Sequence, residues 1–243
     1  MGARLGQHFM VDRALADRIV GYAQLGKGKG GETVLEIGAG EGMLTQALAD
    51  AGAKVIAVEK DPILLKRLKE RSGFTGGSIT VIGGDALKME FPRFDKCVSN
   101  IPYMISKKLV AKLMRHDFDC IVLTVQKEFA EKLVASPGER DYAAISVLVQ
   151  VQASVEILET VPKNAFKPQP KVESAVVRII RGKDMRPIDP GFSDFVARLF
   201  QNRKKKVAGL VAAGHAIPRK LGEKRVFQLT PGEFLRLYSF KSK

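Results

Sequence analysis

The first half of the chain alternates between short apolar runs and longer segments with apolar residues at helical spacing. The runs predict buried strands at residues 33–37, 54–58, 79–82, 94–98 and 120–125. Amphipathic helices are expected before and between these strands, and two of them are opened by residues that favour a helix start, Asp12 and Asp61. Strands that alternate with helices are typical of a parallel sheet covered on both faces, so an α/β fold is predicted.

The second half of the chain follows a different pattern. A helical region at residues 129–151 is interrupted at 136–138, and two more strands are expected at 154–161 and 174–180. A proline-rich loop joins these two strands. Phe166 lies in this loop among polar neighbours, so we expect its ring to be exposed, although an aromatic ring tucked into the core is the alternative.

A change in composition follows Gly182, where prolines become frequent. Such a change is typical of a linker between independently packed units. It predicts a larger domain of residues 1–182 and a smaller, helical domain of residues 183–243.

Positive charge is concentrated in this smaller domain. The formal net charge of the chain is +14, and from Arg181 to the end there are fifteen Lys or Arg against five Asp or Glu. A helix is expected at residues 191–213, with the basic run Arg203–Lys206 in mid-course, and a short helix is expected after Thr230. Concentrated positive charge attracts polyanions, so nucleic acid is the leading partner, and a charged surface that only promotes solubility is the alternative.

Length and composition limit the remaining classes of protein. With 243 residues, 45% of them hydrophobic, the chain can bury one large core or a large and a small one. We expect a cytoplasmic protein, because no run approaches the roughly 20 apolar residues that span a bilayer and the start lacks a signal-peptide pattern. Cys97 and Cys120 lie in apolar runs and are expected to be reduced core thiols, so no metal site is predicted.

Polar or glycine residues follow the ends of four predicted strands: Gly38, Glu59, Asp85 and Asn100. In open α/β sheets, ligands bind in the crevice beyond the carboxyl ends of the strands, so we expect these four residues to converge on one pocket. Carboxylates at two of these positions can accept hydrogen bonds from ribose hydroxyls and from an adenine amine. Glu36 adds negative potential that suits a positively charged sulfonium.

The glycine segment at residues 38–42 fits S-adenosylmethionine better than a nicotinamide dinucleotide. Met43 stands where the dinucleotide pattern has its third glycine. Glu41 places a carboxylate where a pyrophosphate needs backbone N–H groups and little negative charge. A nicotinamide-dependent oxidoreductase is therefore the weaker alternative.

The segment Asn100–Tyr103 is suited to activating a planar amine. The exocyclic amine of a nucleobase is a poor nucleophile, because its lone pair is delocalised into the ring. The side-chain oxygen of Asn100 and the carbonyl of Ile101 can accept hydrogen bonds from the two N–H groups and localise that lone pair. Pro102 stiffens the turn, and Tyr103 offers a flat face for the base. The alternative is a strand-to-helix turn with a proline and an aromatic plug.

Four segments together resemble a known family. They are LGQHFMVD at residues 5–12, EIGAGEG at 36–42, NIPY at 100–103 and FKPQPKVES at 166–174. In order and spacing they are similar to the signatures of the ribosomal RNA adenine dimethyltransferases known as KsgA or Dim1. The resemblance extends from about Arg4 through the basic segment near the C-terminus.

The resemblance implies a Rossmann-like S-adenosylmethionine-dependent methyltransferase with a mostly parallel seven-stranded sheet and a small C-terminal helical domain. It implies dimethylation of N6 of two adjacent adenosines in the 3′ terminal hairpin loop of small-subunit (16S) rRNA, coupled to ribosome biogenesis. The implied partner is this RNA in a partly assembled 30S-type subunit, bound by a monomer, with no membrane or DNA partner. The implied base-binding rings are Tyr103 and Phe166. The implied cofactor contacts are the backbone around His8 and Met10 with Gly38, Gly40, Glu59, Asp85 and Asn100.

One departure and two rivals accompany this resemblance. The family often has Asn at the position of His8, so only backbone contacts are carried over there. The erythromycin-resistance methyltransferases, which modify an adenine of large-subunit rRNA, share the NIPY segment and the proline-rich loop. The opening at residues 5–12 and the run Gln201–Val207 look more like the small-subunit enzymes. A non-catalytic RNA-binding assembly factor is the other rival, and its expected mark, an eroded NIPY segment, is absent.

Overall fold

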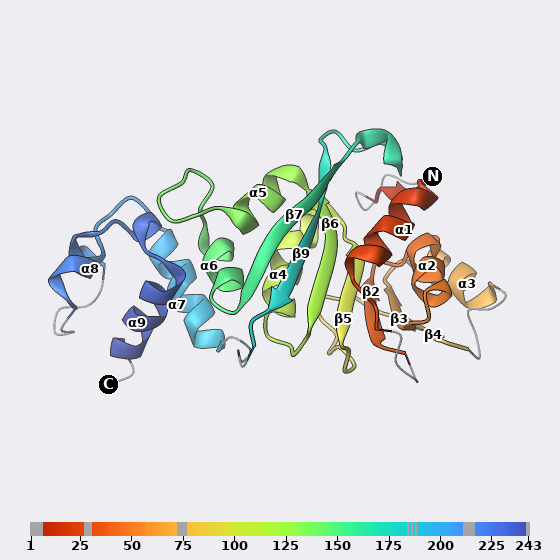
Figure 1. The fold of residues 1–243 in the computed structure, drawn as a ribbon, viewed down its shortest axis with the longest axis horizontal. Helices are drawn as coiled ribbons and strands as arrows, with labels where there is room; N and C mark the ends of the chain where they lie inside the picture. The colour runs from red at the N-terminus through yellow and green to blue at the C-terminus, as the bar shows by residue number, and fades with distance from the viewer. Residues whose placement is uncertain are drawn as a thin grey trace.

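The computed structural model describes residues 7–26, 31–71, 77–183, 185, 187, 189–210 and 217–241. A seven-stranded sheet forms its centre, in the order β4-β3-β2-β5-β6-β9-β7 (Figure 1). The first five strands in this order are parallel, whereas β9 is antiparallel to both β6 and β7. The mostly parallel sheet is therefore confirmed. Its strands are β2 (Thr33–Ile37), β3 (Lys54–Glu59), β4 (Ile79–Gly83), β5 (Lys96–Asn100), β6 (Cys120–Gln126), β7 (Ala153–Val161) and β9 (Ser174–Arg181).

Helices cover both faces of this sheet, as the continuous burial of its central strands requires. In β6, Ile121 and Leu123 face one apolar cluster and Val122 faces the other. Because successive side chains of a strand point to opposite faces, a continuous apolar run is expected when both faces are covered. Helices α1 (Arg13–Tyr22), α2 (Met43–Asp50) and α3 (Pro62–Glu70) contribute to one cluster, and α4 (Ser106–Leu113), α5 (Lys127–Val134) and α6 (Ala144–Gln150) contribute to the other.

The strand order reverses between β2 and β5. From β2 the chain proceeds to β3 and β4 on one side, and then returns to place β5 and β6 on the other side. The loops after β2 and β5 therefore diverge, which opens a crevice at the carboxyl ends of these strands. Gly38 and Asn100 lie at this point, so the predicted convergence has a topological cause.

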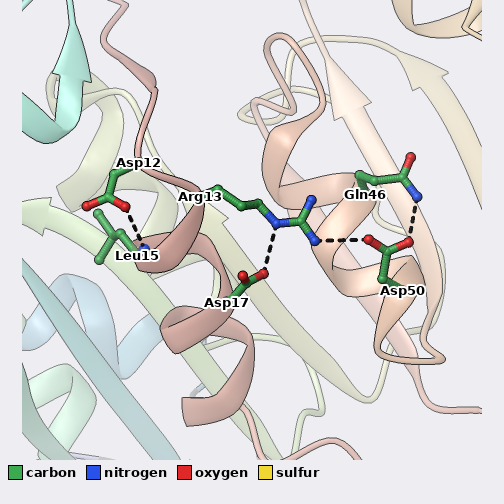
Figure 2. A network of polar contacts seen from close by, with 6 residues as sticks. All are labelled: Asp12, Arg13, Leu15, Asp17, Gln46 and Asp50. Carbon is green, nitrogen blue, oxygen red and sulfur yellow. Dashed lines mark hydrogen bonds and ion pairs between the residues drawn. The ribbon is translucent and has the colours of Figure 1, made fainter.

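Helix α1 is tied to α2 by a network of polar side chains (Figure 2). Arg13 donates hydrogen bonds to Asp17 and to Asp50 of α2, both at 2.9 Å, and Gln46 donates to Asp50 at 2.8 Å. The Arg13 and Asp50 side chains are 49% and 51% exposed, so the pair contributes little net free energy. The start of α1 is fixed by Asp12, whose Oδ1 accepts a hydrogen bond from the N–H of Leu15 at 3.0 Å (Figure 2).

The segment that precedes α1 forms a small second sheet that the sequence did not predict. Strand β1 (Phe9–Met10) pairs antiparallel with β8 (Phe166–Lys167), and Met10 lies opposite Phe166. A short 3₁₀ helix (Lys163–Ala165) leads into β8. This pairing attaches the proline-rich loop to the N-terminal segment, and its partners Met10 and Phe166 are 156 residues apart in the sequence.

The pairing also overturns the expected exposure of Phe166. Its side chain is only 2% exposed and packs in the same apolar cluster as Met10, Leu15 and Ile19. Its polar neighbours Lys163, Asn164 and Lys167 are exposed, whereas Ala165 and Phe166 are both buried. The prediction of an exposed ring was therefore wrong.

Beyond the sheet, helices α7 (Pro190–Phe200), α8 (Arg219–Glu223) and α9 (Pro231–Lys241) lie at one end of the molecule, beyond β7 (Figure 1). The helix expected at residues 191–213 ends at Phe200 in the structure. Backbone N–H groups of Val226 and Phe227 donate to the carbonyls of Lys205 and Arg203, at 3.2 and 3.1 Å. In a continuing helix these carbonyls would accept hydrogen bonds from the next helical turn. Because they accept from a later segment instead, the basic run lies in a turn. Residues 211–213 lie outside the described residues.

The C-terminal helices share a core with the sheet. Phe195 and Leu199 of α7 and Phe234 of α9 belong to the same buried cluster as Ile121 of β6. The boundary at residues 182 and 183 stays a prediction. In the part of the chain that the structure describes, no helix is both long and apolar enough to cross a membrane. Both cysteines are buried free thiols, as expected.

Candidate active site

A cavity of about 300 Å³ lies at the carboxyl ends of the parallel strands, a size typical of small-molecule sites. It brings together all but one of the residues selected from the sequence. The exception is Phe166, which does not line this cavity. Those that line it are His8, Met10, Gly38, Gly40, Glu59, Asp85, Asn100, Ile101 and Tyr103.

The glycine turn after β2 brings bare backbone to the cavity. Gly38 and Gly40 have φ angles of +74° and +59°, in the left-handed region that side chains disfavour. A Cβ atom on Gly40 would lie 3.2 Å from Cδ1 of Phe9. The Gly38 N–H donates to the carbonyl of Val58 at 2.8 Å, which holds the turn against β3.

The carboxylate of Glu59 holds this turn from the other side. Its Oε2 accepts a hydrogen bond from the N–H of Gly40 at 2.8 Å, and its Oε1 accepts from the N–H groups of Lys60 and Asp61, both at 2.8 Å. Glu59 is only 4% exposed, so these bonds compensate for the burial of its charge. A carboxylate oxygen has two lone pairs, so Oε2 can still accept from one ribose hydroxyl.

Asp85 lies at the next strand end and is paired with a lysine. Its Oδ2 accepts from Nζ of Lys60 at 2.9 Å, and its Oδ1 accepts from the N–H of Leu87 at 3.0 Å. The Lys60 ammonium lowers the pKa of this carboxyl, so it is ionised at neutral pH. Because the Lys60 side chain is 62% exposed, this ion pair is weak enough for an adenine amine to compete with it.

The carboxyl of Glu36 does not carry the negative charge that was expected beside a sulfonium. Its side chain is 2% exposed and accepts a hydrogen bond from the hydroxyl of Thr45 at 2.6 Å. Burial, with a smaller contribution from the nearby Glu59 carboxylate, raises the pKa of Glu36 to about 8, against the opposing effect of the hydrogen bonds from Thr45. In the protein without cofactor, this carboxyl is therefore mostly protonated at pH 7.

This protonation predicts a pH dependence of stability. The ordinary pKa of 4.5 applies to the unfolded chain, so between about pH 4.5 and 8 the folded protein holds a proton that the unfolded chain releases. The free energy of unfolding therefore falls as pH rises, by up to about 1.4 kcal/mol per pH unit from this group. Glu36→Gln should remove this slope, measured by urea unfolding at pH 5.5 and 7.5. An equal slope in both proteins would contradict the assignment.

The Asn100 side chain is oriented by the protein backbone. Its Nδ2 donates to the carbonyl of His8 at 3.0 Å. Since a carbonyl can only accept, this bond identifies which end of the amide is nitrogen. The amide oxygen is therefore the end that can accept from a substrate N–H.

Tyr103 is fixed at the end of its side chain. Its hydroxyl hydrogen-bonds with that of Ser174 on β9 at 2.5 Å, and burial raises its pKa. Tyr103 is the first residue of a short 3₁₀ helix (Tyr103–Ile105), which follows Pro102 and leads into α4. Sequence reasoning missed Ser174 as a partner, although it closes the FKPQPKVES segment.

Apolar side chains complete the cavity, and sequence reasoning did not select them. The omitted apolar residues include Phe9, Leu44, Ala86, Leu87 and Met104. The position of Ala86 and Leu87 directly after Asp85 was a usable signal, because an adenine ring needs an apolar slot beside the group that binds its amine.

This set of groups fits S-adenosylmethionine. The close-packed glycine turn admits a ligand against bare backbone, Oε2 of Glu59 suits a ribose hydroxyl, and Asp85 beside Leu87 suits an adenine. These features lie at the switch point of the sheet, where such ligands bind.

Solved structures with the same architecture agree. A dimethyladenosine transferase from Plasmodium falciparum superposes with a TM-score of 0.83 and 28% identity, covering 97% of this chain and 98% of that one. The 23S rRNA methyltransferase ErmE superposes with a TM-score of 0.71 and 28% identity, covering 97% and 100%. The fold is that of the Rossmann-like, S-adenosylmethionine-dependent methyltransferases.

The family follows from the sequence comparisons. Residues 2–240 match the family model described as ribosomal RNA adenine dimethylase. A probable ribosomal RNA small subunit methyltransferase A from Methanosarcina barkeri is 40% identical over 255 residues, covering 97% of this chain and 86% of that protein. The chain belongs to the ribosomal RNA adenine dimethylase family, whose cofactor is S-adenosylmethionine.

Proposed function

We propose that this protein transfers methyl groups from S-adenosylmethionine to N6 of adenosines in small-subunit rRNA. Its product is N6,N6-dimethyladenosine at two adjacent positions of the 3′ terminal hairpin loop. The observation that carries this proposal is the oriented amide of Asn100, at the edge of a cavity suited to this cofactor. Membership of the family supports the substrate class.

The chain's residues activate the amine by accepting its protons. The adenine N6 group donates one N–H to Oδ1 of Asn100 and the other to the carbonyl of Ile101, which localises the lone pair on nitrogen. The N6–carbon bond forms in line as the carbon–sulfur bond breaks, and the sulfonium becomes a neutral thioether. The resulting cationic amine loses its proton to water, and a second round gives the dimethylated base.

The cofactor supplies an electrophilic methyl group. We assign its ribose to Glu59 and its adenine to Asp85. The backbone near Gly38 and Gly40, with His8 and Met10 of the N-terminal segment, would hold its amino-acid end.

Tyr103 provides a stacking face for the target base, which must leave the RNA stack to reach the cavity. The role of Phe166 as the second face stays a prediction. Its ring is buried in the apolar cluster that contains Met10, Leu15 and Ile19. That role therefore requires the ring to leave this cluster when RNA binds.

The substrate is proposed to be rRNA in a partly assembled 30S-type subunit, bound by a monomer in the cytoplasm, with no DNA partner. A large-subunit enzyme of the ErmE kind is the second candidate, since that structure is also similar. The higher TM-score of the dimethyladenosine transferase and the 40% identity to small-subunit relatives favour the first. A non-catalytic assembly factor is disfavoured by the intact Asn100 geometry.

Purified small and large subunits that lack this modification provide the test. Incubation with the protein and labelled S-adenosylmethionine should label small-subunit rRNA alone. Labelling confined to large-subunit rRNA would favour the second candidate, and labelling of neither would contradict methyl transfer to rRNA.

The basic turn at Lys204–Lys206 is expected to contact the RNA backbone. All three side chains are exposed. Changing them to Gln should weaken RNA binding and lower the slope of log affinity against log salt by about 2 to 3, because each lost phosphate contact removes about 0.7 to 0.9. Filter binding from 50 to 200 mM salt measures this slope.

Two controls separate phosphate contact from other effects. Changing Lys54, Lys66 and Lys69 to Gln removes the same charge near α3, at the opposite end of the molecule, and should leave the slope unchanged (Figure 1). Arg203→Gln should instead lower stability, because its guanidinium donates to the carbonyls of Glu139 and Arg140. An unchanged slope after the Lys204–Lys206 changes would refute their contact with RNA.

A further inference from the structure

A largely exposed methionine lies at the mouth of the cavity. Met104 follows Tyr103 directly and lines the cavity, yet it is 83% exposed. Both conditions are met only where the cavity opens to solvent. Single exposed apolar residues are common on protein surfaces, so Met104 becomes informative through its position and its neighbours.

Two lysines share the face of the chain on which Met104 lies. The backbone is helical from the 3₁₀ helix after Pro102 into α4, and Lys107 and Lys108 follow Met104 by three and four residues. Residues at this spacing lie on one face of a helix. The burial pattern agrees, because these three residues are exposed whereas Ser106 and Leu109 are buried. We call Met104, Lys107 and Lys108 the mouth patch.

The two lysines of the mouth patch have no structural role in the folded protein. Among the residues that the structure describes, no carboxylate forms an ion pair with Lys107 or Lys108. Lys112, one turn further along α4, differs because its ammonium donates to the carbonyls of Ala86 and Met89. A lysine in the first turn of a helix is also slightly unfavourable, because the helix dipole places partial positive charge there. Helix stability therefore does not account for this pair of lysines.

The chemistry of the mouth patch matches an RNA strand on both sides of a flipped nucleotide. A base that leaves its stack exposes the face of the base beside it, and methionine is one of the side chains that cover such faces. The backbone that carries the flipped base passes the same opening, where ammonium groups can neutralise its phosphates. Because Met104 adjoins Tyr103, the proposed platform for the target base, one strand can reach both residues.

We propose that the mouth patch binds the nucleotides next to the target adenosine. Met104 packs on the base beside the target, and Lys107 and Lys108 contact the two flanking phosphates. The proposal rests on the proposed function and deepens it, because it adds an RNA contact outside the cavity. The three side chains bind RNA and take no part in bond making.

Two probes separate the target base from its neighbours. Adenosine offers the target base alone, whereas the trinucleotide ApApA adds a base on each side and two phosphates. Their affinities are measured by calorimetry with protein saturated with S-adenosylhomocysteine, and the KM for small subunits and the melting temperature are measured beside them. The variants are Met104→Gln, Met104→Leu and the paired change of Lys107 and Lys108 to Gln.

Met104→Gln should weaken trinucleotide binding and leave adenosine binding unchanged. Full burial of a methionine side chain corresponds to roughly 10- to 150-fold in affinity, and packing on one base buries about half of it. We therefore expect a loss of about 3- to 12-fold in trinucleotide affinity and a matching rise in KM for small subunits. Met104→Leu should recover most of this loss, because it restores an apolar side chain. The melting temperature should not fall, since the side chain is exposed.

The paired lysine change should lower the slope of log affinity against log salt for the trinucleotide by about 1.4, because each lost contact with a single strand removes about 0.7. An unchanged slope would overturn the phosphate contacts. The matched control changes Lys54 and Lys69 to Gln, which are exposed and do not line the cavity, and should leave the slope unchanged. Met185→Gln is the control for Met104, because Met185 is 50% exposed and follows the end of β9, at the opposite edge of the sheet.

Three further results would overturn the proposal. A wild-type protein that binds the trinucleotide no better than adenosine would leave the mouth patch without a role. An equal loss for both probes in Met104→Gln would place Met104 against the target base itself. A raised KM for small subunits with unchanged trinucleotide binding would place the mouth patch against a ribosomal protein.

Failure of the proposed function is distinguishable from failure of this proposal. The probes are bound without methyl transfer, so the comparison of adenosine with the trinucleotide does not depend on catalysis. A wild-type protein that labels no rRNA would contradict the proposed function, whereas the binding results alone decide the role of the mouth patch.

Discussion

Asn100→Ala should lower the rate of methyl transfer by about 10²- to 10³-fold while RNA affinity stays within about threefold of wild type. The magnitude is that of removing one preorganised polar group that stabilises charge in the transition state. The variant keeps the backbone carbonyl of Ile101, so one of the two acceptors for the amine remains. Single-turnover methylation and filter binding on the same preparations measure the two quantities.

Two further variants define what the amide contributes. Asn164→Ala removes an exposed asparagine in the 3₁₀ helix before β8 and should leave the rate unchanged. Asn100→Asp keeps an oxygen acceptor but loses the N–H that binds the carbonyl of His8, so its rate should fall between those of wild type and Asn100→Ala. Methyl transfer at the wild-type rate by Asn100→Ala would refute the role of this side chain.

Glu59→Ala should impair both the cofactor and the fold. It removes the acceptor for three backbone N–H groups, each of which costs on the order of 1–3 kcal/mol when left unsatisfied in a buried site. We expect a melting temperature at least about 5 °C lower. Loss of the charged acceptor should also weaken cofactor binding by about 10- to 100-fold, measured by calorimetry.

The matched control is Glu90→Ala, which removes an exposed carboxylate after β4 and should change neither quantity. Glu59→Gln covers the case in which Glu59→Ala does not fold. It keeps the size of the side chain and one oxygen acceptor, so it should fold with reduced cofactor affinity. Cofactor affinity equal to wild type in folded Glu59→Gln would contradict the ribose assignment.

The sequence predicted the sheet and the convergence of strand ends, because both depend on local patterns. Apolar runs of strand length set the strands, and the polar residues at their ends, from Gly38 to Asn100, follow from the parallel topology. Tyr103 lines the cavity for the same reason, because it follows the end of β5 by three residues.

Features set by long-range pairing were not predictable in this way. The pairing of Met10 with Phe166 and the bonds from residues 226–227 to the basic turn join segments far apart in sequence. Local polarity therefore suggested an exposed Phe166 and a continuous helix through Arg203. The protonation of Glu36 could not be predicted from local sequence either, because its pKa depends on how deeply the side chain is buried between β2 and α2.

We propose above all that this site dimethylates adenine at N6 in small-subunit rRNA. The most direct test is mass spectrometry of nucleosides from small-subunit rRNA after reaction of unmodified subunits with the protein and S-adenosylmethionine. We expect N6,N6-dimethyladenosine at two adjacent positions of the 3′ terminal hairpin with wild type, and its near absence with Asn100→Ala. Methyl groups found only on other atoms or other nucleosides would contradict it.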